Sequence, residues 1–180
     1  ETGPGGILPL QRKLAAVLAA DVVGYSRLIA EDEARTLDAL RALRRESFEP
    51  LVAEHRGEVV KRMGDGWLVS FASVVDAAQC AIQVQERLAG HDRIKLRIGV
   101  HLGDIVHEDE DIYGDGVNIA SRLQEVAEPG GVLLSGTAYE SVIGRLDAVF
   151  ENVGTQNLKN ITRDVTAWVW TGQPVSFVSS

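Results

Sequence analysis

The order in which strand and helix patterns follow one another is the feature that most constrains this fold. Short apolar or alternating runs of strand length are separated by segments in which apolar residues recur at helical spacing. The first six are a strand over 14–23, a helical stretch over 34–57 that Pro50 bends or interrupts, strands over 58–61 and 67–71, a helix over 73–90 and a strand over 94–100. This βαββαβ order is typical of the ferredoxin-like α+β fold, an antiparallel sheet with helices on one face.

Further elements are appended to this core at its C-terminal side. A helix pattern over 114–127 ends at a Pro-Gly-Gly sequence, and it is followed by a short strand over 132–134, a short helix over 137–143 and a closing strand over 165–170. A chain of 180 residues fits one domain with a full-sized core. We therefore expect one domain over 12–171, preceded by a cloning remnant or linker over 1–11 and followed by a frayed tail over 172–180.

The composition is that of an ordinary globular protein, and the net charge bears on which kinds of molecule this chain can bind. Hydrophobic residues make up 45% of the chain and charged residues 24%, and the net charge is −8. A nucleic-acid binder needs a basic footprint, so no nucleic-acid partner is expected. The sequence contains no run of about 18 apolar residues, so no membrane span is predicted. The single cysteine, Cys80, lies among alanines in a helix pattern and is expected to be buried, which fits a cytoplasmic location for this domain, although the parent protein could still be membrane-attached.

Two aspartates stand where neighbouring strands of this plan end or turn. Asp21 follows the apolar residues of the first strand, and Asp65 lies in a Gly-Asp-Gly turn between the next two. A lone charge at the edge of a core is costly, and Mg²⁺ is usually held by one or two carboxylates plus substrate phosphates. Taken alone, Asp65 also fits a hairpin turn and Asp21 a cap of the following turn. Together they favour a divalent-metal site for phosphoryl transfer.

The third helix pattern carries a polar pair. Asn118 and Arg122 are four residues apart and share one helix face, whereas Val117, Ala120 and Leu123 are expected to pack inward. An amide and a guanidinium on one face could orient a sugar and bind a phosphate, although such pairs on an isolated helix are more often a solvated surface. The acidic stretch before this helix does not fit an EF-hand loop, which requires a glutamate at the position of Arg122.

Three segments together resemble the class III nucleotidyl cyclase catalytic domain, in particular its bacterial members. They are residues 20–26 (Ala-Asp-Val-Val-Gly-Tyr-Ser), 60–66 (Val-Lys-Arg-Met-Gly-Asp-Gly) and 111–122 (Asp-Ile-Tyr-Gly-Asp-Gly-Val-Asn-Ile-Ala-Ser-Arg). Their order and internal spacing both match, and the resemblance covers roughly residues 12–170. It implies a lyase of cyclic-nucleotide signalling that binds a nucleoside triphosphate and divalent metal.

The resemblance also implies roles on the phosphate side of the site. Asp21 and Asp65 match the ligands of two Mg²⁺ (or Mn²⁺) ions, and Val22 matches the residue whose backbone carbonyl also reaches a metal. One ion activates the ribose 3′-hydroxyl and the other neutralises the phosphates, so that in-line attack on the α-phosphorus gives 3′,5′-cyclic AMP and pyrophosphate. Lys159 matches a lysine that touches the terminal phosphates, although the family often has Gly where Asn160 stands.

The remaining roles concern the nucleoside. Lys61 matches the residue that donates to adenine N1, and Asp111 the one that accepts from the adenine amino group. Asn118 matches the ribose-orienting asparagine and Arg122 the arginine that stabilises the transition state. Guanine presents the reverse hydrogen-bonding pattern, and guanylate cyclases of the family carry Glu and Cys-like residues at the base-reading positions, so ATP is the expected substrate.

The resemblance further implies a homodimer with composite active sites. One subunit supplies the metal aspartates and its partner supplies the nucleoside-binding residues, so a twofold dimer holds two equivalent sites. Alternative readings are a catalytically weak cyclase-like domain that binds nucleotide for regulation, a guanylate cyclase, another palm-like enzyme such as a polymerase or diguanylate cyclase, and a purely structural interaction domain. The signature of a diguanylate cyclase is absent from the sequence. Sensor or regulatory domains in a parent protein would fit a catalytic module of this kind.

Overall fold

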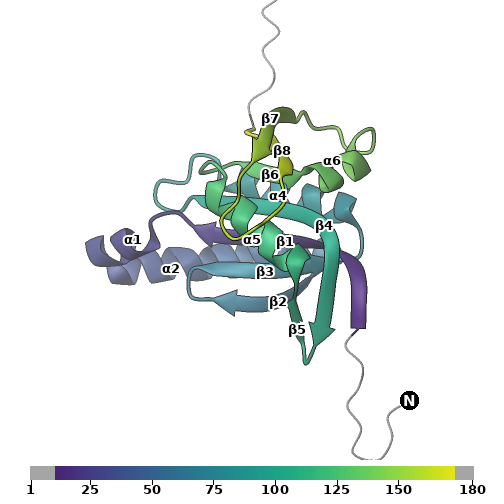
Figure 1. Ribbon diagram of the computed structural model, residues 1–180. Coiled ribbons are helices and arrows are strands. Elements are labelled where there is room, and N and C mark those ends of the chain that lie inside the picture. The colour runs from purple at the N-terminus through teal and green to yellow at the C-terminus, as the bar shows by residue number, and fades with distance from the viewer. Residues whose placement is uncertain (1–10, 173–180) are drawn as a thin grey trace, which may run out of the picture.

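The computed structural model describes residues 11–172, and these form one mixed sheet with helices on both faces (Figure 1). The strands are β1 Gln11–Val22, β2 Glu58–Met63, β3 Gly66–Phe71, β4 Leu96–Glu108, β5 Asp111–Tyr113, β6 Val132–Ser135, β7 Glu151–Gln156 and β8 Val165–Trp170. Their order across the sheet is β2-β3-β1-β4-β6-β8-β7, and β5 pairs with β4. The helices are α1 Tyr25–Glu31, α2 Glu33–Leu43, the π-helical turn η1 Arg44–Phe48, α3 Glu49–Glu54, α4 Val74–Leu88, α5 Asp115–Val126 and α6 Gly136–Val142.

The ferredoxin-like core is confirmed. Strand β1 lies between β3 and β4 and pairs antiparallel with both, and β2 pairs antiparallel with β3. The two connections of this βαββαβ unit, the α1–α3 segment and α4, contribute to one large buried cluster on one face of the sheet. The appended β6 pairs parallel with β4 and antiparallel with β8.

Helix α5 covers the opposite face of the sheet. The sequence had predicted helices on one face only. The reason lies in β1, where residues 15–20 are apolar without interruption, so both faces of the strand must be covered. Ala16 and Leu18 pack in the cluster with α4, whereas Ala15 and Val17 pack in a second cluster with Ala120 of α5. The central strand therefore sits between two helical layers (Figure 1).

Local sequence signals account for several element boundaries. The Ser73 side chain accepts a hydrogen bond from the Asp76 backbone N–H at 3.3 Å and caps α4, the helix predicted over 73–90. The stretch predicted over 34–57 is helical, and its irregular turn lies at η1, just before Pro50. Because proline has no N–H to donate back to the preceding turn, the helix widens there and resumes with Pro50 in the first turn of α3.

The sequence did not predict α1, β5 or β7. Strand β7 is a polar, exposed edge strand and α1 and β5 are short, so none carries a clear apolar periodicity. Strand β4 is also longer than the segment predicted over 94–100. Within residues 11–172, no helix is long and apolar enough to cross a membrane. The expected remnant over 1–11 and tail over 172–180 lie almost entirely outside the described residues.

Candidate active site

The fold brings Asp21 and Asp65 together at one end of β1. Asp21 is the penultimate residue of β1, and Asp65 lies in the turn between β2 and β3. The Val22 N–H donates to the Asp65 carbonyl oxygen at 2.8 Å, which fixes the turn against the end of the strand. Gly66 pairs directly with Asp21, and a Cβ at Gly66 would lie 2.7 Å from the carbonyl oxygen of Ala20. The close approach of this turn to β1 therefore requires glycine.

The carboxylate of Asp21 is partly buried beside a guanidinium. Burial raises the pKa of Asp21, and the nearby Asp65 charge raises it further, whereas Arg97 and Gln124 lower it, so the net shift is upward. The Arg97 Nε lies 3.3 Å from one carboxylate oxygen and its Nη2 lies 3.2 Å from the other. The Gln124 side-chain amide also lowers the pKa of Asp21, although its nitrogen forms no hydrogen bond of standard geometry. Negative charge is thus concentrated here and only partly neutralised.

The donor set at this end of β1 fits a hard divalent cation. Two carboxylates and the backbone carbonyls next to them are the oxygen ligands that Mg²⁺ and Mn²⁺ prefer. A dication would relieve the repulsion through which Asp65 raises the pKa of Asp21. Residues 11–172 hold no group of three His, Cys, Asp or Glu side chains that could chelate a metal without further ligands. The remaining coordination positions would have to come from water and a substrate, as is usual for Mg²⁺ bound to phosphates.

Lys61 and Asp111 form an ion pair within one chain. The Nζ atom of Lys61, on β2, lies 3.8 Å from a carboxylate oxygen of Asp111, on β5. The β4–β5 hairpin reaches back to β2 because Ile112 packs in the same buried cluster that Val60 joins. The other oxygen of Asp111 accepts a hydrogen bond from the Ile112 N–H at 2.7 Å, which orients the carboxylate. A cationic donor and an anionic acceptor therefore stand side by side at the surface.

Helix α5 presents Asn118 and Arg122 as the sequence predicted. Asn118 is exposed, whereas Ala120 and Leu123 are fully buried. The Nη1 atom of Arg122 lies 3.1 and 2.8 Å from the two carboxylate oxygens of Glu125, three residues further along the helix. Both partners are partly solvated, so this pair contributes at most about 1 kcal/mol and the guanidinium can exchange partners at low cost.

Lys159 lies exposed in the turn that follows β7. Its neighbour Asn160 has a φ of 62°, in the left-handed region that favours glycine and that asparagine tolerates better than most residues. A glycine at position 160 would adopt this backbone conformation at least as readily.

Sequence reasoning missed Arg97 and Gln124, the two residues that surround Asp21. Arg97 occupies a polar position in the alternating strand predicted over 94–100, where it is indistinguishable from a solvent-facing residue. Only the register of β1 against β4, in which Asp21 and Arg97 are direct partners, reveals the contact. Gln124 lies on the buried side of α5, and its proximity to Asp21 depends on the face of the sheet that α5 covers.

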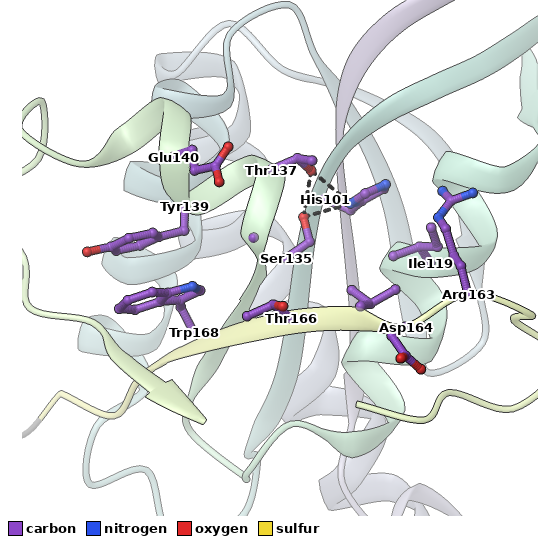
Figure 2. Close-up of a pocket in the computed structure, with 12 residues that line it drawn as sticks. His101, Ile119, Ser135, Thr137, Tyr139, Glu140, Arg163, Asp164, Thr166 and Trp168 are labelled. Atoms are coloured by element: carbon purple, nitrogen blue, oxygen red, sulfur yellow. Dashed lines mark hydrogen bonds between the residues drawn. The ribbon is translucent and has the colours of Figure 1, made fainter. Parts of the chain in front are cut away.

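A cavity in the described part of the chain lies elsewhere (Figure 2). Its volume is about 430 Å³, and none of the predicted site residues lines it. His101 lies in its wall with Nδ1 2.7 Å from the Ser135 hydroxyl, and Tyr139 stacks on Trp168 with ring centroids 3.6 Å apart. Burial lowers the pKa of His101 to about 4, so the imidazole is neutral at pH 7. Asp21 and Asp65, and likewise the Lys61–Asp111 ion pair, lie outside the lining of this cavity.

Comparisons with known proteins identify relatives of the whole domain. The family model described as "Adenylate and Guanylate cyclase catalytic domain" matches residues 11–172. The chain is 49% identical over 168 residues to a protein of Rhizobium meliloti named "Putative adenylate cyclase 3", covering 89% of this chain and 29% of that protein. It is 34% identical over 141 residues to an adenylate cyclase of Streptomyces coelicolor, covering 77% of this chain and 36% of that protein. The chain thus spans about a third of the length of these relatives.

Solved structures agree at the level of the whole domain. The adenylate/guanylate cyclase/hydrolase from Silicibacter pomeroyi superposes with a TM-score of 0.85 at 39% identity, covering 91% of this chain and 99% of that one. The adenylyl cyclase CyaB from P. aeruginosa superposes with a TM-score of 0.79 at 23% identity, covering 93% and 98%, a likeness of fold. With the three sequence segments, the fold and the family model in agreement over the same residues, the chain belongs to the family of adenylate and guanylate cyclase catalytic domains.

Proposed function

We propose that this chain is the catalytic domain of an adenylate cyclase, which converts ATP to 3′,5′-cyclic AMP and pyrophosphate. The observation that carries the choice of ATP is the pairing of Lys61 with Asp111 at 3.8 Å. Adenine presents an acceptor at N1 and a donor at its amino group, which a lysine and a carboxylate complement. Guanine would meet each side chain with the wrong partner, and a site built on hydrogen bonds discriminates strongly against such mispairing. The similar protein of Rhizobium meliloti is itself named a putative adenylate cyclase.

At the phosphate end, Asp21, Asp65 and the backbone carbonyl of Val22 would hold two Mg²⁺ or Mn²⁺ ions. When bound, such ions lower the pKa of a hydroxyl, polarise phosphoryl oxygens and neutralise a leaving pyrophosphate. Asp21 and Asp65 contribute by presenting their carboxylates together from a rigid strand end and a tight turn. That rigidity reduces the reorganisation needed when the substrate arrives.

At the nucleoside end, Asn118 orients the ribose so that its 3′-oxygen points at the α-phosphorus. The 3′-oxygen forms the new P–O bond as it loses its proton, the bond to the pyrophosphate oxygen breaks, and cyclic AMP is left. Arg122 leaves its weak pairing with Glu125 and offsets the charge that develops on the phosphorus oxygens. Lys159, exposed on its turn, contacts the terminal phosphates.

We further propose that the active sites are shared across a twofold homodimer. The site residues lie on open surface, and exposed apolar side chains flank them: Met63 precedes the Asp65 turn, and Tyr113 follows Asp111. Exposed apolar groups beside charged functional residues are typical of an interaction surface. One protomer would supply Asp21 and Asp65, and its partner the nucleoside-binding residues.

The test is to incubate the protein with ATP or GTP and Mn²⁺ and to identify the product by mass spectrometry. Formation of cyclic AMP with little cyclic GMP supports the proposal. Preferential formation of cyclic GMP would favour the guanylate cyclase reading. Nucleotide binding without any cyclic product would favour a regulatory domain instead.

A further inference from the structure

We propose that the cavity lined by His101, Tyr139 and Arg163 is a binding site for a small organic cation that carries N–H donors on an apolar or aromatic body. We call it the His101 cavity. Its volume of about 430 Å³ lies within the range of cavities that bind small molecules. None of the residues proposed to carry out the cyclase reaction lines it, so this second site does not depend on that reaction.

The hydrogen bonds around His101 determine which imidazole nitrogen carries the proton. The Thr137 hydroxyl donates to the Leu102 carbonyl oxygen at 2.8 Å, so its single hydrogen is used there. Its contact with the Ser135 hydroxyl, at 3.1 Å, must therefore use the hydrogen of Ser135. Because Ser135 then has no hydrogen left for the His101 Nδ1 atom 2.7 Å away, the imidazole is the donor in that contact. The neutral ring thus carries its proton on Nδ1, and Nε2 is a hydrogen-bond acceptor.

The Nε2 atom of His101 is a buried acceptor that lacks a protein donor. The residue is 5% exposed, and burial lowers its pKa to about 4, so Nε2 keeps its lone pair at pH 7. Among residues 11–172, the hydrogen bonds of this ring are made by Nδ1 alone. Nε2 lies on the side of the ring away from Ser135, toward the wall formed by Ile119 and Arg163 (Figure 2). A buried acceptor without a donor is costly, so a ligand N–H placed here would be well compensated.

The charges around the cavity favour a cation over an anion. Glu140 and Asp164 line it from exposed positions, and neither forms an ion pair within the described part of the chain. The cationic residue of the lining, Arg163, is paired with Asp115. Three carboxylates therefore surround one guanidinium, and the local charge is negative. A carboxylate or phosphate ligand would be repelled, whereas a cation would be attracted.

The remaining walls suit an apolar or aromatic body. Ile119 and Val165 are buried, and on another side Tyr139 stacks on Trp168 with ring centroids 3.6 Å apart (Figure 2). Apolar ligand surface placed against these groups is removed from water, and aromatic rings also attract cations. A metal ion fits the cavity less well, because residues 11–172 hold no group of three His, Cys, Asp or Glu side chains that could chelate one. The lining therefore fits an organic cation.

The test compares three probes of the same shape and different charge. Benzamidine is a planar aromatic cation with N–H donors, benzamide is its neutral counterpart and benzoate its anionic one. Binding is followed by NMR titration at neutral pH. We expect benzamidine to bind at least about 10-fold more tightly than benzoate, the factor given by roughly one additional hydrogen bond. The ¹⁵N resonance of His101 Nε2 should be that of an unprotonated nitrogen in the free protein, and benzamidine should shift it.

Two kinds of variant place the probe in the cavity. Thr166→Trp puts a bulky side chain at an exposed position of the lining and should weaken benzamidine binding by about 10-fold or more, because it clashes with the ligand. Glu140→Gln removes one carboxylate with little change of shape and should weaken benzamidine by about 2- to 3-fold while leaving benzamide unchanged. The matched control is Glu151→Gln, an exposed position on β7 outside the lining, which should change neither.

The inference is overturned if benzamidine shows no saturable binding, or if benzoate binds equally well. It is also overturned if Nε2 carries the proton in the free protein, or if Thr166→Trp, folded by circular dichroism, binds benzamidine as the wild type does. Cyclic AMP formation is measured separately on the same preparation. A protein that binds benzamidine but forms no cyclic AMP contradicts the proposed function alone, and a protein that forms cyclic AMP but binds no benzamidine contradicts only this inference.

Discussion

The polar residues of the proposed active site and those around the cavity that His101 lines are held in opposite ways. Asp21, Lys61 and Asp111 lie at a partly solvated surface, in ion pairs that leave further hydrogen-bonding capacity. His101, in the cavity wall, is 5% exposed, has a pKa of about 4 and is bonded to Ser135. The charged side chains of the first region can still bind a ligand, whereas the polar side chains of the second region form hydrogen bonds that stabilise the fold. Substitutions should therefore affect activity in the first region and stability in the second.

The largest expected effect is on the metal carboxylates. Asp65→Ala should lower ATP cyclisation by at least about 1000-fold, or about 4 kcal/mol in activation free energy, because the metal loses a ligand. Its melting temperature should change little, since Asp65 is only half-buried and contributes its backbone carbonyl, which alanine keeps, to the fold. Cyclic AMP formation and thermal unfolding are measured on the same preparation. Asp38→Ala, which alters an exposed ion pair on α2, is the control.

The next effect concerns Arg122. Arg122→Ala should reduce kcat about 100-fold with a much smaller change in the affinity for ATP, because the guanidinium is needed where charge develops in the transition state. Steady-state kinetics and binding of 3′-deoxy-ATP separate the two quantities. Mixing this variant with Asp65→Ala should restore activity that neither has alone. Failure to restore it, with both proteins folded, would contradict the shared-site dimer.

In the cavity region, a change of pH should alter the free energy of unfolding through His101. The unfolded chain binds a proton at His101 near pH 6.5 and the folded chain only near pH 4, so protonation favours unfolding. His101 therefore contributes a loss of stability that grows as the pH falls from about 6.5 to about 4, reaching on the order of 3 kcal/mol. His101→Gln should show a flatter pH dependence of the unfolding free energy than wild type over this window. Urea unfolding at several pH values measures the difference, and equal slopes would contradict the expectation.

The smallest effect concerns the choice of base. Lys61→Glu combined with Asp111→Cys should lower the preference for ATP over GTP by about 10- to 100-fold, because both hydrogen-bonding patterns are reversed or removed. The effect is limited because Lys61 is about half exposed, so water can compensate a lost contact. The ratio of kcat/KM values for the two nucleotides measures it. An unchanged ratio would show that other groups read the base.

Local signals explain why much of the fold could be predicted. The Gly-Asp-Gly hairpin and the apolar patterns of the core strands and helices all act over a few residues, and the structure has these elements where they were expected. The exposed edge strand β7 and the three-residue β5 have no such pattern, so they could not be found. The π-helical turn before Pro50 depends on how a continuous helix accommodates a missing donor, which no periodicity encodes.

The sequence by itself determined the ferredoxin-like core, the family resemblance and the chemical identity of the candidate residues. These follow from short-range spacing: alternation, helical periodicity and turn chemistry. Only the tertiary structure decided that α5 covers the second face of β1, that β5 returns to bring Asp111 to Lys61, and that Arg97 stands beside Asp21. Each of these depends on register and packing between segments far apart in the chain; Asp21 and Arg97, for example, have a sequence separation of 76. The burial of these residues and the charges next to them are set by the tertiary structure alone, and they determine which polar residues form the candidate site.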